Sequence, residues 1–466
     1  MRLKYTYLLS LIIIITSLVV FSDPIKELLR NYMPFHSKIF VHKLILDRDI
    51  HYTKKILAYQ AMQDFFIVDK NPTLFKVENS NYFYHQDIQL DIFDTNFLKK
   101  IKNGKARGGA YLAHSSGNIY IAQENGLFFF IPIDKLNLEQ NNIKLKHIPS
   151  NIFSQIEYFD FYGPGQYGMK GFLADDKHLY VSVSFMVKPN CFNTSILRAD
   201  LDESFLYFEL FFVPNNCVEI QNDYGEYNAS DSGGRIVAFK KNKILFSTGT
   251  FRYRDLAQEL NSELGKILAI DKNTAQAKIV SMGHRNVMGL SYLKETQEIW
   301  STEHGPNGGD EININKYQDN GDIKNFGWPI SSYGEHYSAS TMNPEGALIV
   351  DTNDKTYLKA PLYKSHIEHG FVEPEQYFVP SIGISAITAT NKSLFNNEGF
   401  NIIFGSKGNN VKVENEKTIF LFNPQKKSMI KIFSGERVRD ILYIPNSSQI
   451  IFTGETNGVI GIISNK

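Results

Sequence analysis

The chain has 466 residues, with 49 acidic and 49 basic side chains. This balance gives no overall positive field and argues against a nucleic-acid partner. The 35 Phe and 25 Tyr residues favour strands, and apolar residues rarely recur with the helical period of about 3.6. The length would fit roughly two or three domains, but large propellers run as one. Composition therefore favours an all-β protein.

An apolar run, YTYLLSLIIIITSLVVF, occupies residues 5–21 and follows Arg2 and Lys4. Its length is at the short limit for a membrane-spanning helix and slightly long for the core of a signal peptide. Residues 1–22 are therefore predicted to be a cleaved signal peptide or a retained membrane anchor, with a buried core helix as the third alternative. Either export alternative places the rest of the chain outside the cytoplasm, as a periplasmic protein that is free or tethered to the inner membrane.

The two cysteines, Cys191 and Cys217, flank the strand-like runs SILRADL and LYFELFFV. An exported protein meets oxidising conditions, so a disulfide across this hairpin is expected. Two buried free thiols are the alternative.

A short unit of strand, turn and strand recurs between residues 101 and 466. Its copies begin at Ser116, Asp176, Asn242, Gln297, Asn401 and Ser448. Recurring sets of short strands are typical of propellers. We expect a six-bladed β-propeller with a long insertion at roughly 317–378 in its fourth blade, and a large β-sandwich is the alternative. Residues 23–100 show no period and are expected to form a stem that leads to an early strand or two.

Several loops between these strands carry unusual motifs. They are SDSGGRIVAF (230–239), GHRN (283–286), STEHGPNGGDEININ (301–315), NFGWP (325–329) and GERVRDILYIP (435–445). In this order they resemble the glucose/sorbosone dehydrogenase family, and the resemblance covers roughly residues 108–466. It implies a six-bladed quinoprotein propeller that uses pyrroloquinoline quinone and calcium.

The resemblance also implies which residues bind the quinone. The cofactor carries several carboxylates, and its pocket needs cations at the rim; Lys407, Arg437 and Arg439 match the family's carboxylate-binding positions. Arg437 and Arg439 alternate along a predicted strand, so both side chains should leave one face, although an exposed basic face is the alternative. The other matched cofactor positions are Gln166, Arg285, Asn286 and Ser381.

The loop at 301–315 is expected to bind calcium, which takes about six to eight oxygen ligands. The carbonyls of Gly305 and Pro306 match those that hold the cofactor's calcium in the family. Glu311 and the carbonyl of Phe326 resemble a second calcium site. A glycine-rich loop without metal, capped by Asp310, is the alternative.

The chain departs from the family at the general base. Asp231 stands where the family has a histidine before x-G-G-R, and Thr250 stands where it has the acidic residue that orients that histidine. Asp231 could itself be the base, the site could bind the cofactor without catalysis, or the alignment could be displaced by one or two residues. The stacking tryptophan of some members is also absent, and Tyr377 or Phe378 could replace it.

These residues together predict an exported oxidoreductase that oxidises an aldose or another alcohol by hydride transfer to the quinone. Arg285 and Asp231 would be catalytic, with Arg285 stabilising the developing negative charge. A quinone or cytochrome would accept the electrons. The alternative is a non-catalytic propeller scaffold that retains the fold and calcium.

Overall fold

The computed structural model describes residues 65–70, 88–94, 109–124, 126–136, 142–155, 168–223, 225–342, 348–395, 399–408, 417–445 and 447–465. The apolar run at 5–21 and Gln166 lie outside the described residues. Within these described ranges, no helix is long and apolar enough to cross a membrane. A compact unit extends from Asp64 to Lys466, and this unit contains every element below.

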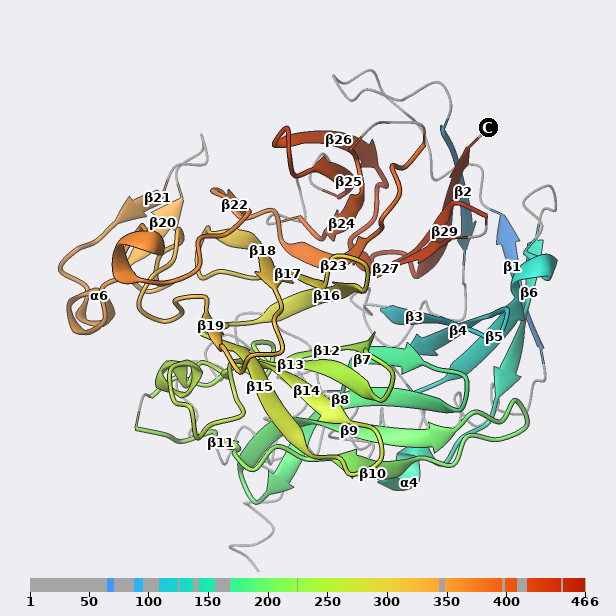
Figure 1. Cartoon of the computed structure of the whole chain (residues 1–466), viewed down its shortest axis with the longest axis horizontal. Helices are drawn as coiled ribbons and strands as arrows, with labels where there is room; N and C mark the ends of the chain where they lie inside the picture. The colour runs from blue at the N-terminus through green and yellow to red at the C-terminus, as the bar shows by residue number, and fades with distance from the viewer. Residues whose placement is uncertain are drawn as a thin grey trace, which may run out of the picture. The chain divides into compact units, whose positions relative to one another are not determined.

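Antiparallel strands dominate this unit (Figure 1). The first sheet contains β3 (Ala110–Ser115), β4 (Asn118–Gln123), β5 (Phe128–Pro132) and β6 (Asn142–Ile148). The second contains β7 (Gly168–Ala174), β8 (His178–Lys188), β9 (Cys191–Asp200) and β10 (Glu209–Phe212), with β11 (Val218–Glu219) paired to β9. The third contains β12 (Gly233–Phe239), β13 (Lys243–Thr248), β14 (Lys266–Asp271) and β15 (Ala277–Met282), with β19 (Lys324–Asn325) parallel to β15.

Three further sheets follow in chain order. The fourth contains β16 (Val287–Leu293), β17 (Glu298–Glu303), β18 (Asp310–Lys316) and β22 (Gln376–Phe378). The fifth contains β23 (Ile384–Ala389), β24 (Ile402–Ser406), β25 (Thr418–Asn423) and β26 (Ser428–Phe433). The sixth contains β27 (Val438–Ile444), β28 (Gln449–Gly454), β29 (Val459–Asn465) and β2 (Ile88–Asp94).

The first strand of each sheet lies closest to a common centre (Figure 1). These inner strands, β3, β7, β12, β16, β23 and β27, each contact the next one around a closed ring, and β27 returns to β3. The expectation of an all-β, six-bladed propeller is confirmed. Each recurring sequence unit supplies the second and third strands of one blade, such as β4 and β5 or β28 and β29.

The N-terminal strands close the ring. β2 pairs with β29 from Ile88↔Asn465 to Asp94↔Val459, and β1 (Phe65–Lys70) pairs with both β2 and β6. The first and last blades thus share one nine-stranded sheet. The early strand or two expected in the range 23–100 are thus β1 and β2, which pair with strands of the propeller.

Hydrophobic clusters fill the spaces between neighbouring blades. Phe128 of the first blade lies between Phe172 and Phe208 of the second, with ring centroids 6.1 and 5.1 Å away. Phe404 and Phe420 stack at 4.7 Å within a cluster shared by the fourth and fifth blades. Blade strands are buried on both faces, which explains why the sequence is rich in aromatic and β-branched residues.

The insertion in the fourth blade carries short elements only. They are the hairpin of β20 (Ser340–Met342) and β21 (Leu348–Val350), α6 (Lys355–Lys359) and η5 (Ile367–His369). Elsewhere the described helices are η3 (Ile133–Lys135), α4 (Ile152–Gln155) and η4 (Arg254–Ala257). The insertion ends in β22, so it returns to the outer edge of its own blade.

Buried polar contacts join the inner strands near the centre. Arg235 on β12 pairs with Asp440 on β27 at 2.7 Å and donates to the Arg439 carbonyl at 2.9 Å. Asp440 also accepts from the backbone N–H of Leu112 at 2.8 Å. The arginine of the GGR motif therefore connects blades that are far apart in sequence, and loss of one partner of such a buried pair typically costs about 3–5 kcal/mol.

Candidate active site

Strand direction gathers the predicted site residues at one end of the propeller. In an antiparallel blade, the start of the inner strand and the end of the second strand share an edge. Asp231 and Arg285 precede the inner strands β12 and β16, whereas Gly305 and Lys407 follow the second strands β17 and β24. The loops at this end form a common surface although they come from different blades.

Lys407, Arg437 and Arg439, which we call the cation cluster, lie together around Glu455. Arg437 Nε is 2.8 Å from Glu455 Oε1, and Arg439 Nη2 is 2.5 Å from Glu455 Oε2. Arg437 Nη1 also donates to the Lys407 carbonyl at 2.7 Å. Burial alone would raise the pKa of Glu455, but Arg439, Lys407 and Arg437 together hold it well below its usual value.

Arg437 and Arg439 do not reach the same region by alternating along one strand, as was expected. β27 begins at Val438, so Arg437 lies before the strand. The pairing with β28 shifts between Val438 and Asp440, which makes Arg439 the extra residue of a β-bulge. Because bulges re-aim a side chain, we attribute the position of Arg439 to this irregularity rather than to strand alternation.

A second bulge places Lys170 in the same region. The pairing of β7 with β8 shifts between Met169 and Gly171. Glu124 and Asp231 influence the pKa of Lys170, which burial lowers to about 8. Glu124 itself lies 2.8 Å from Arg439 Nη2. Lys170 thus interacts with Asp231 and with Arg439 of the cation cluster, and Glu124 pairs with the same arginine. Neither residue was among the predicted site residues.

Asp231 is buried and is held by two arginines. Arg285 Nη2 and Arg252 Nε both contact its Oδ2, at 2.9 and 3.1 Å. We call Asp231, Arg252 and Arg285 the Asp231 cluster. Burial would lower the pKa of Arg285, but Asp231 and other carboxylates outweigh burial and raise it. The two guanidinium contacts orient Asp231 from two directions.

Arg252 was not predicted, and its backbone explains its position. Phe251 and Arg252 have φ angles of 51° and 73°, which few non-glycine residues adopt. This turn follows Thr250, whose Oγ1 is buried without a hydrogen-bond partner among the described residues. Thr250 stands where an acidic orienting residue was expected, and Arg252, two residues later, contacts Asp231 instead. Strained backbone of this kind is concentrated at functional sites.

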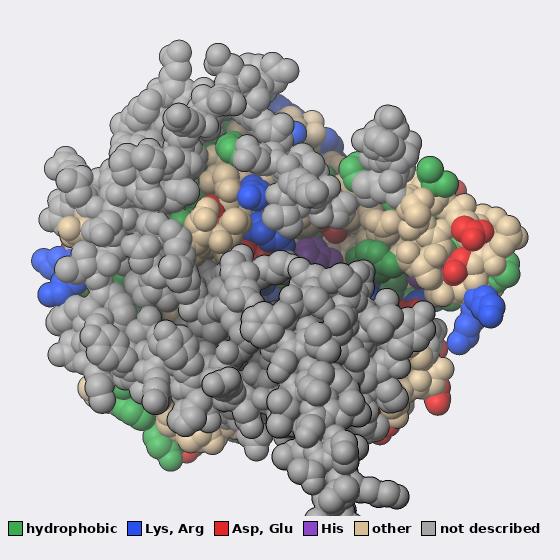
Figure 2. Space-filling view, turned by 180° about the vertical axis from the view of Figure 1, so that it is seen from behind, with side chains coloured by type: hydrophobic (Ala, Val, Ile, Leu, Met, Phe, Trp, Pro, Cys, Tyr) green, Lys and Arg blue, Asp and Glu red, His purple; other side chains and the backbone are tan. Residues whose placement is uncertain are grey.

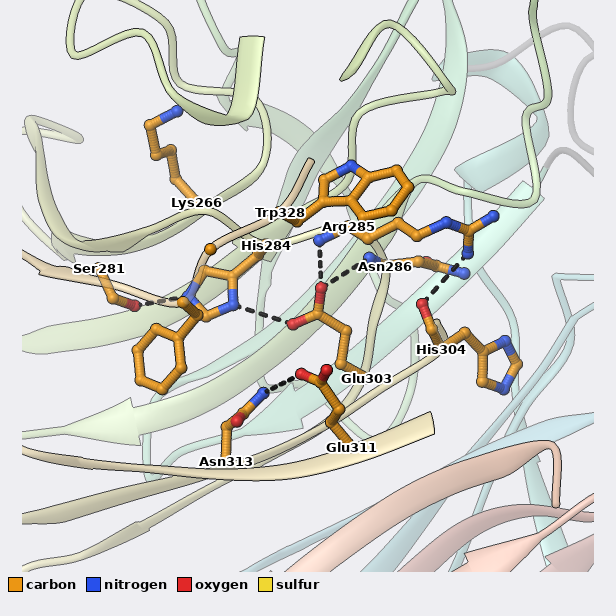
Figure 3. A network of polar contacts seen from close by, with 12 residues as sticks. Lys266, Ser281, His284, Arg285, Asn286, Glu303, His304, Glu311, Asn313 and Trp328 are labelled. Atoms are coloured by element: carbon orange, nitrogen blue, oxygen red, sulfur yellow. Dashed lines mark hydrogen bonds and ion pairs between the residues drawn. The ribbon is translucent and has the colours of Figure 1, made fainter. Parts of the chain in front are cut away.

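The GHRN motif is anchored by Glu303 (Figure 3). One carboxylate oxygen accepts from the backbone N–H groups of Arg285 and Asn286. The other lies 3.0 Å from His284 Nδ1. Glu303 therefore fixes the backbone that carries Arg285.

Asn286 and His304 complete this arrangement. Asn286 Oδ1 accepts from the backbone N–H of Gly233, two residues after Asp231, at 3.1 Å. The backbone carbonyl of His304 accepts from Arg285 Nη1 at 3.1 Å. Nε2 of the His304 ring lies 2.6 Å from the Ile384 carbonyl oxygen. Burial lowers the pKa of His304 to about 3, so its ring is neutral. His304 and Glu303 face different partners and do not form a joint metal site.

Three of the four residues expected to bind calcium line one small cavity, and Pro306 is not among its lining residues. Gly305, Glu311 and Phe326 line it together with Arg285 and His366. Across the described residues, no group of three or more His, Cys, Asp or Glu side chains is arranged to hold a metal ion; a site built on the carbonyls of Gly305 and Pro306 would not need one. Glu311 is buried and touches His366 and Asn313 instead.

The expected stacking residues have other partners. Tyr377 stacks on Tyr333 at 3.7 Å, and Phe378 packs against Phe404 at 5.9 Å. Tyr337 and Trp328 instead lie beside the arginines that hold Asp231. Arg252 and Arg285 lie over Tyr337 at 5.2 and 5.9 Å, and Arg285 lies over Trp328 at 5.4 Å.

Six basic side chains lie at this end of the propeller: Lys170, Arg252, Arg285, Lys407, Arg437 and Arg439. Burial lowers the pKa of both lysines, and the carboxylates that act on these groups include Glu124, Asp231, Glu303, Asp310 and Glu455. Arg439 Nε is buried and has no hydrogen-bond partner in the described part of the chain. Figure 2 shows basic side chains and a histidine close together near the middle of one face. This donor set fits a small molecule that carries several carboxylates.

A disulfide lies in the same blade as Lys170. Cys191 and Cys217 are bonded, with their Cα atoms 5.5 Å apart. Cys217 immediately precedes β11, which pairs with β9 at Val218↔Phe192. The bond therefore ties the loop before β12, and with it the approach to Asp231, to the outer part of the second blade.

The model of the glucose/sorbosone dehydrogenase family matches residues 164–462, and the chain belongs to this family. The aldose sugar dehydrogenase YliI of Escherichia coli is 27% identical over 242 residues, which are 48% of this chain and 58% of that protein. The chain spans about half the length of the curated relatives it matches, 46% and 58%.

Solved structures support the fold. The soluble aldose sugar dehydrogenase of Escherichia coli in its apo form has a TM-score of 0.56 at 18% identity, covering 81% of this chain and 100% of that one. The PQQ-bound aldose sugar dehydrogenase of Streptomyces coelicolor has a TM-score of 0.50 at 14% identity, covering 81% and 99%. At these identities the likeness establishes the propeller, and the chemistry must be argued from the residues.

Proposed function

We propose that this protein is an exported dehydrogenase that binds pyrroloquinoline quinone and calcium and oxidises an aldose or another alcohol. The observation that carries the proposal is the juxtaposition of the cation cluster with the Asp231 cluster at one end of the propeller. Family membership supports an oxidoreductase, and a related propeller is described in its PQQ-bound form.

The cation cluster would hold the carboxylates of the cofactor. Arginine presents paired donors that match a carboxylate, and Lys407 adds a third cation beside Arg437. Excess positive charge would remain after Glu455 and Glu124 have paired with Arg439. The carbonyls of Gly305 and Pro306 would offer oxygen ligands to the calcium ion that accompanies the cofactor.

The Asp231 cluster would handle the proton. The bound quinone supplies hydride acceptance, with calcium polarising the reactive carbonyl. Asp231 would take the hydroxyl proton of the substrate, while Arg252 and Arg285 keep its carboxylate in place. Arg285 would also stabilise negative charge that develops nearby, because its guanidinium is already fixed by Asp231 and the His304 carbonyl.

Tyr337 and Trp328 would line the approach of a sugar to Asp231, since both lie beside Arg285. A quinone or cytochrome would take the electrons. The disulfide between Cys191 and Cys217 supports an oxidising compartment, which agrees with export.

Dye reduction tests this proposal. The cofactor-free protein is incubated with the quinone and calcium, then assayed with a panel of aldoses and simple alcohols. Turnover that requires both quinone and substrate is expected. If the protein binds the quinone but reduces no dye with any substrate, the non-catalytic scaffold becomes the better account.

A further inference from the structure

His366 joins the two groups expected to bind a second calcium ion. It lies in the insertion of the fourth blade, immediately before η5, and is only 1% exposed. Its Nδ1 is 3.1 Å from the Phe326 carbonyl oxygen, and its Nε2 is 3.4 Å from Glu311 Oε1. The imidazole ring therefore lies between the carboxylate and the carbonyl.

The ring faces an acceptor on both sides. A backbone carbonyl and an ionised carboxylate accept hydrogen bonds but cannot donate them. Nδ1 is within hydrogen-bond distance of the Phe326 carbonyl, and Nε2 is within ion-pair distance of Glu311 Oε1. The ring thus occupies the space between these two oxygens that a metal ion would need.

The donor set around Glu311 does not fit calcium. Its Oε1 faces His366, and its Oε2 accepts from Asn313 Nδ2 at 3.2 Å. Calcium requires about six to eight oxygen ligands at roughly 2.3–2.6 Å. Here, a side chain already lies against each carboxylate oxygen, so an ion would first have to displace His366 and Asn313.

The surrounding chain is shaped for the ring. Tyr333 stacks on His366 with centroids 5.5 Å apart, and Glu373 accepts from the His366 backbone N–H at 3.1 Å. Gly327 has a φ of +89°, and a Cβ there would lie only 2.8 Å from His366 Nδ1. A side chain at this position would therefore crowd the imidazole. Contacts from separate parts of the insertion hold the ring in place.

We propose that the His366 side chain takes the place of the second calcium ion in this chain. The connection between β18 and the NFGWP loop is then made by protein atoms alone. Its stability should not depend on calcium, and Glu311 is not a metal ligand. This inference does not rest on dehydrogenase activity, because it concerns metal content and stability in the absence of the quinone.

The test is a calcium count on the cofactor-free protein. Wild type, Glu311→Gln and His366→Ala are dialysed against calcium, and bound metal is measured by elemental analysis. Wild type and Glu311→Gln should hold the same number of ions. His366→Ala removes the ring, so calcium should raise its Tm more than it raises that of wild type.

His369→Ala is the matched control, since His369 is an exposed histidine three residues further along the same segment. It should behave as wild type in both measurements. Loss of one bound calcium in Glu311→Gln would overturn the proposal, because Glu311 would then be a ligand in the native protein. The comparison of wild type with Glu311→Gln decides the matter alone if His366→Ala does not fold.

Discussion

The cation cluster and the Asp231 cluster face the same end of the propeller but differ in how far they follow the family. Lys407, Arg437 and Arg439 stand at every basic position that was expected, and Glu455 holds the two arginines together. In the Asp231 cluster, an aspartate and a threonine stand where a histidine and its acidic partner were expected. Arg252 contacts Asp231 from a strained turn. The positions expected to bind the cofactor thus keep their residue types, whereas the positions expected to accept the proton do not.

This difference suggests how an altered base can remain oriented. A histidine base needs an acidic partner on its second nitrogen, but a carboxylate base needs cations or N–H donors. The exchange of the acidic partner for Arg252 follows that rule. The changes at positions 231 and 250 therefore agree with a catalytic Asp231 that Arg252 orients, and they agree equally with a site that binds the cofactor without catalysis. Experiments on each cluster can separate these two outcomes.

The largest expected effect is on turnover in Asp231→Asn. The amide keeps the shape of the side chain but cannot take a proton, and loss of a general base typically costs about 100- to 10,000-fold. Quinone affinity should change little because the cation cluster is intact. Turnover is measured by dye reduction at saturating quinone, and an unchanged rate would rule out Asp231 as the base.

The next effect is on cofactor affinity in Arg439→Gln. Each hydrogen bond to a charged group contributes about 1.5–3 kcal/mol, so the quinone should bind roughly 100-fold more weakly. In Arg439→Gln, Glu455 would lose one of its two arginine partners. The double variant Arg439→Gln/Glu455→Gln, which restores the charge balance, is therefore measured for quinone affinity in parallel. Arg198→Gln is the control, since Arg198 donates to the Lys272 carbonyl in another blade. Equal affinity in all variants would place the cofactor elsewhere.

A smaller effect is expected for Arg252→Gln. Asp231 would keep Arg285 but lose its second guanidinium contact. We expect kcat to fall by about fivefold, which corresponds to the upper range of roughly 1 kcal/mol for a partly exposed ion pair, while quinone affinity and Tm stay near wild type. Arg252→Lys should recover part of kcat. A parallel loss of kcat and Tm, without rescue by lysine, would indicate a structural role only.

The smallest effect is expected for Glu124→Gln. Its carboxylate competes for Arg439 at 2.8 Å, so removal of its charge should strengthen quinone binding by up to about fivefold, in line with a modest ion pair. Calorimetric titration measures the change. Weaker binding in this variant would show that Glu124 helps to build the pocket instead of opposing its ligand.

Much of the fold could be read from the sequence, because each blade repeats the same pattern of strand, turn and strand. The part that could not be read depends on pairings across the whole chain. β2 completes the sixth blade beside β29. No local pattern in residues 88–94 predicts that this strand pairs with one at the other end of the chain.

The site residues also fall into those that the sequence could predict and those that it could not. Arg285 and Lys407 stand in recognisable motifs, and the structure brings their clusters together. Arg252 was missed because its position depends on positive φ angles at non-glycine residues, which composition does not reveal. His366 was missed because it lies in an insertion without motifs and meets Glu311 only after the chain has folded back.

Quinone titration of the cofactor-free protein in calcium, followed by absorbance, tests the central claim most directly. The account predicts saturable binding at micromolar quinone, with one cofactor per chain, and a clear loss of affinity when Arg437 and Arg439 are both changed to Gln. An absence of binding by wild type at these concentrations, or binding that is indifferent to both arginines, would contradict it.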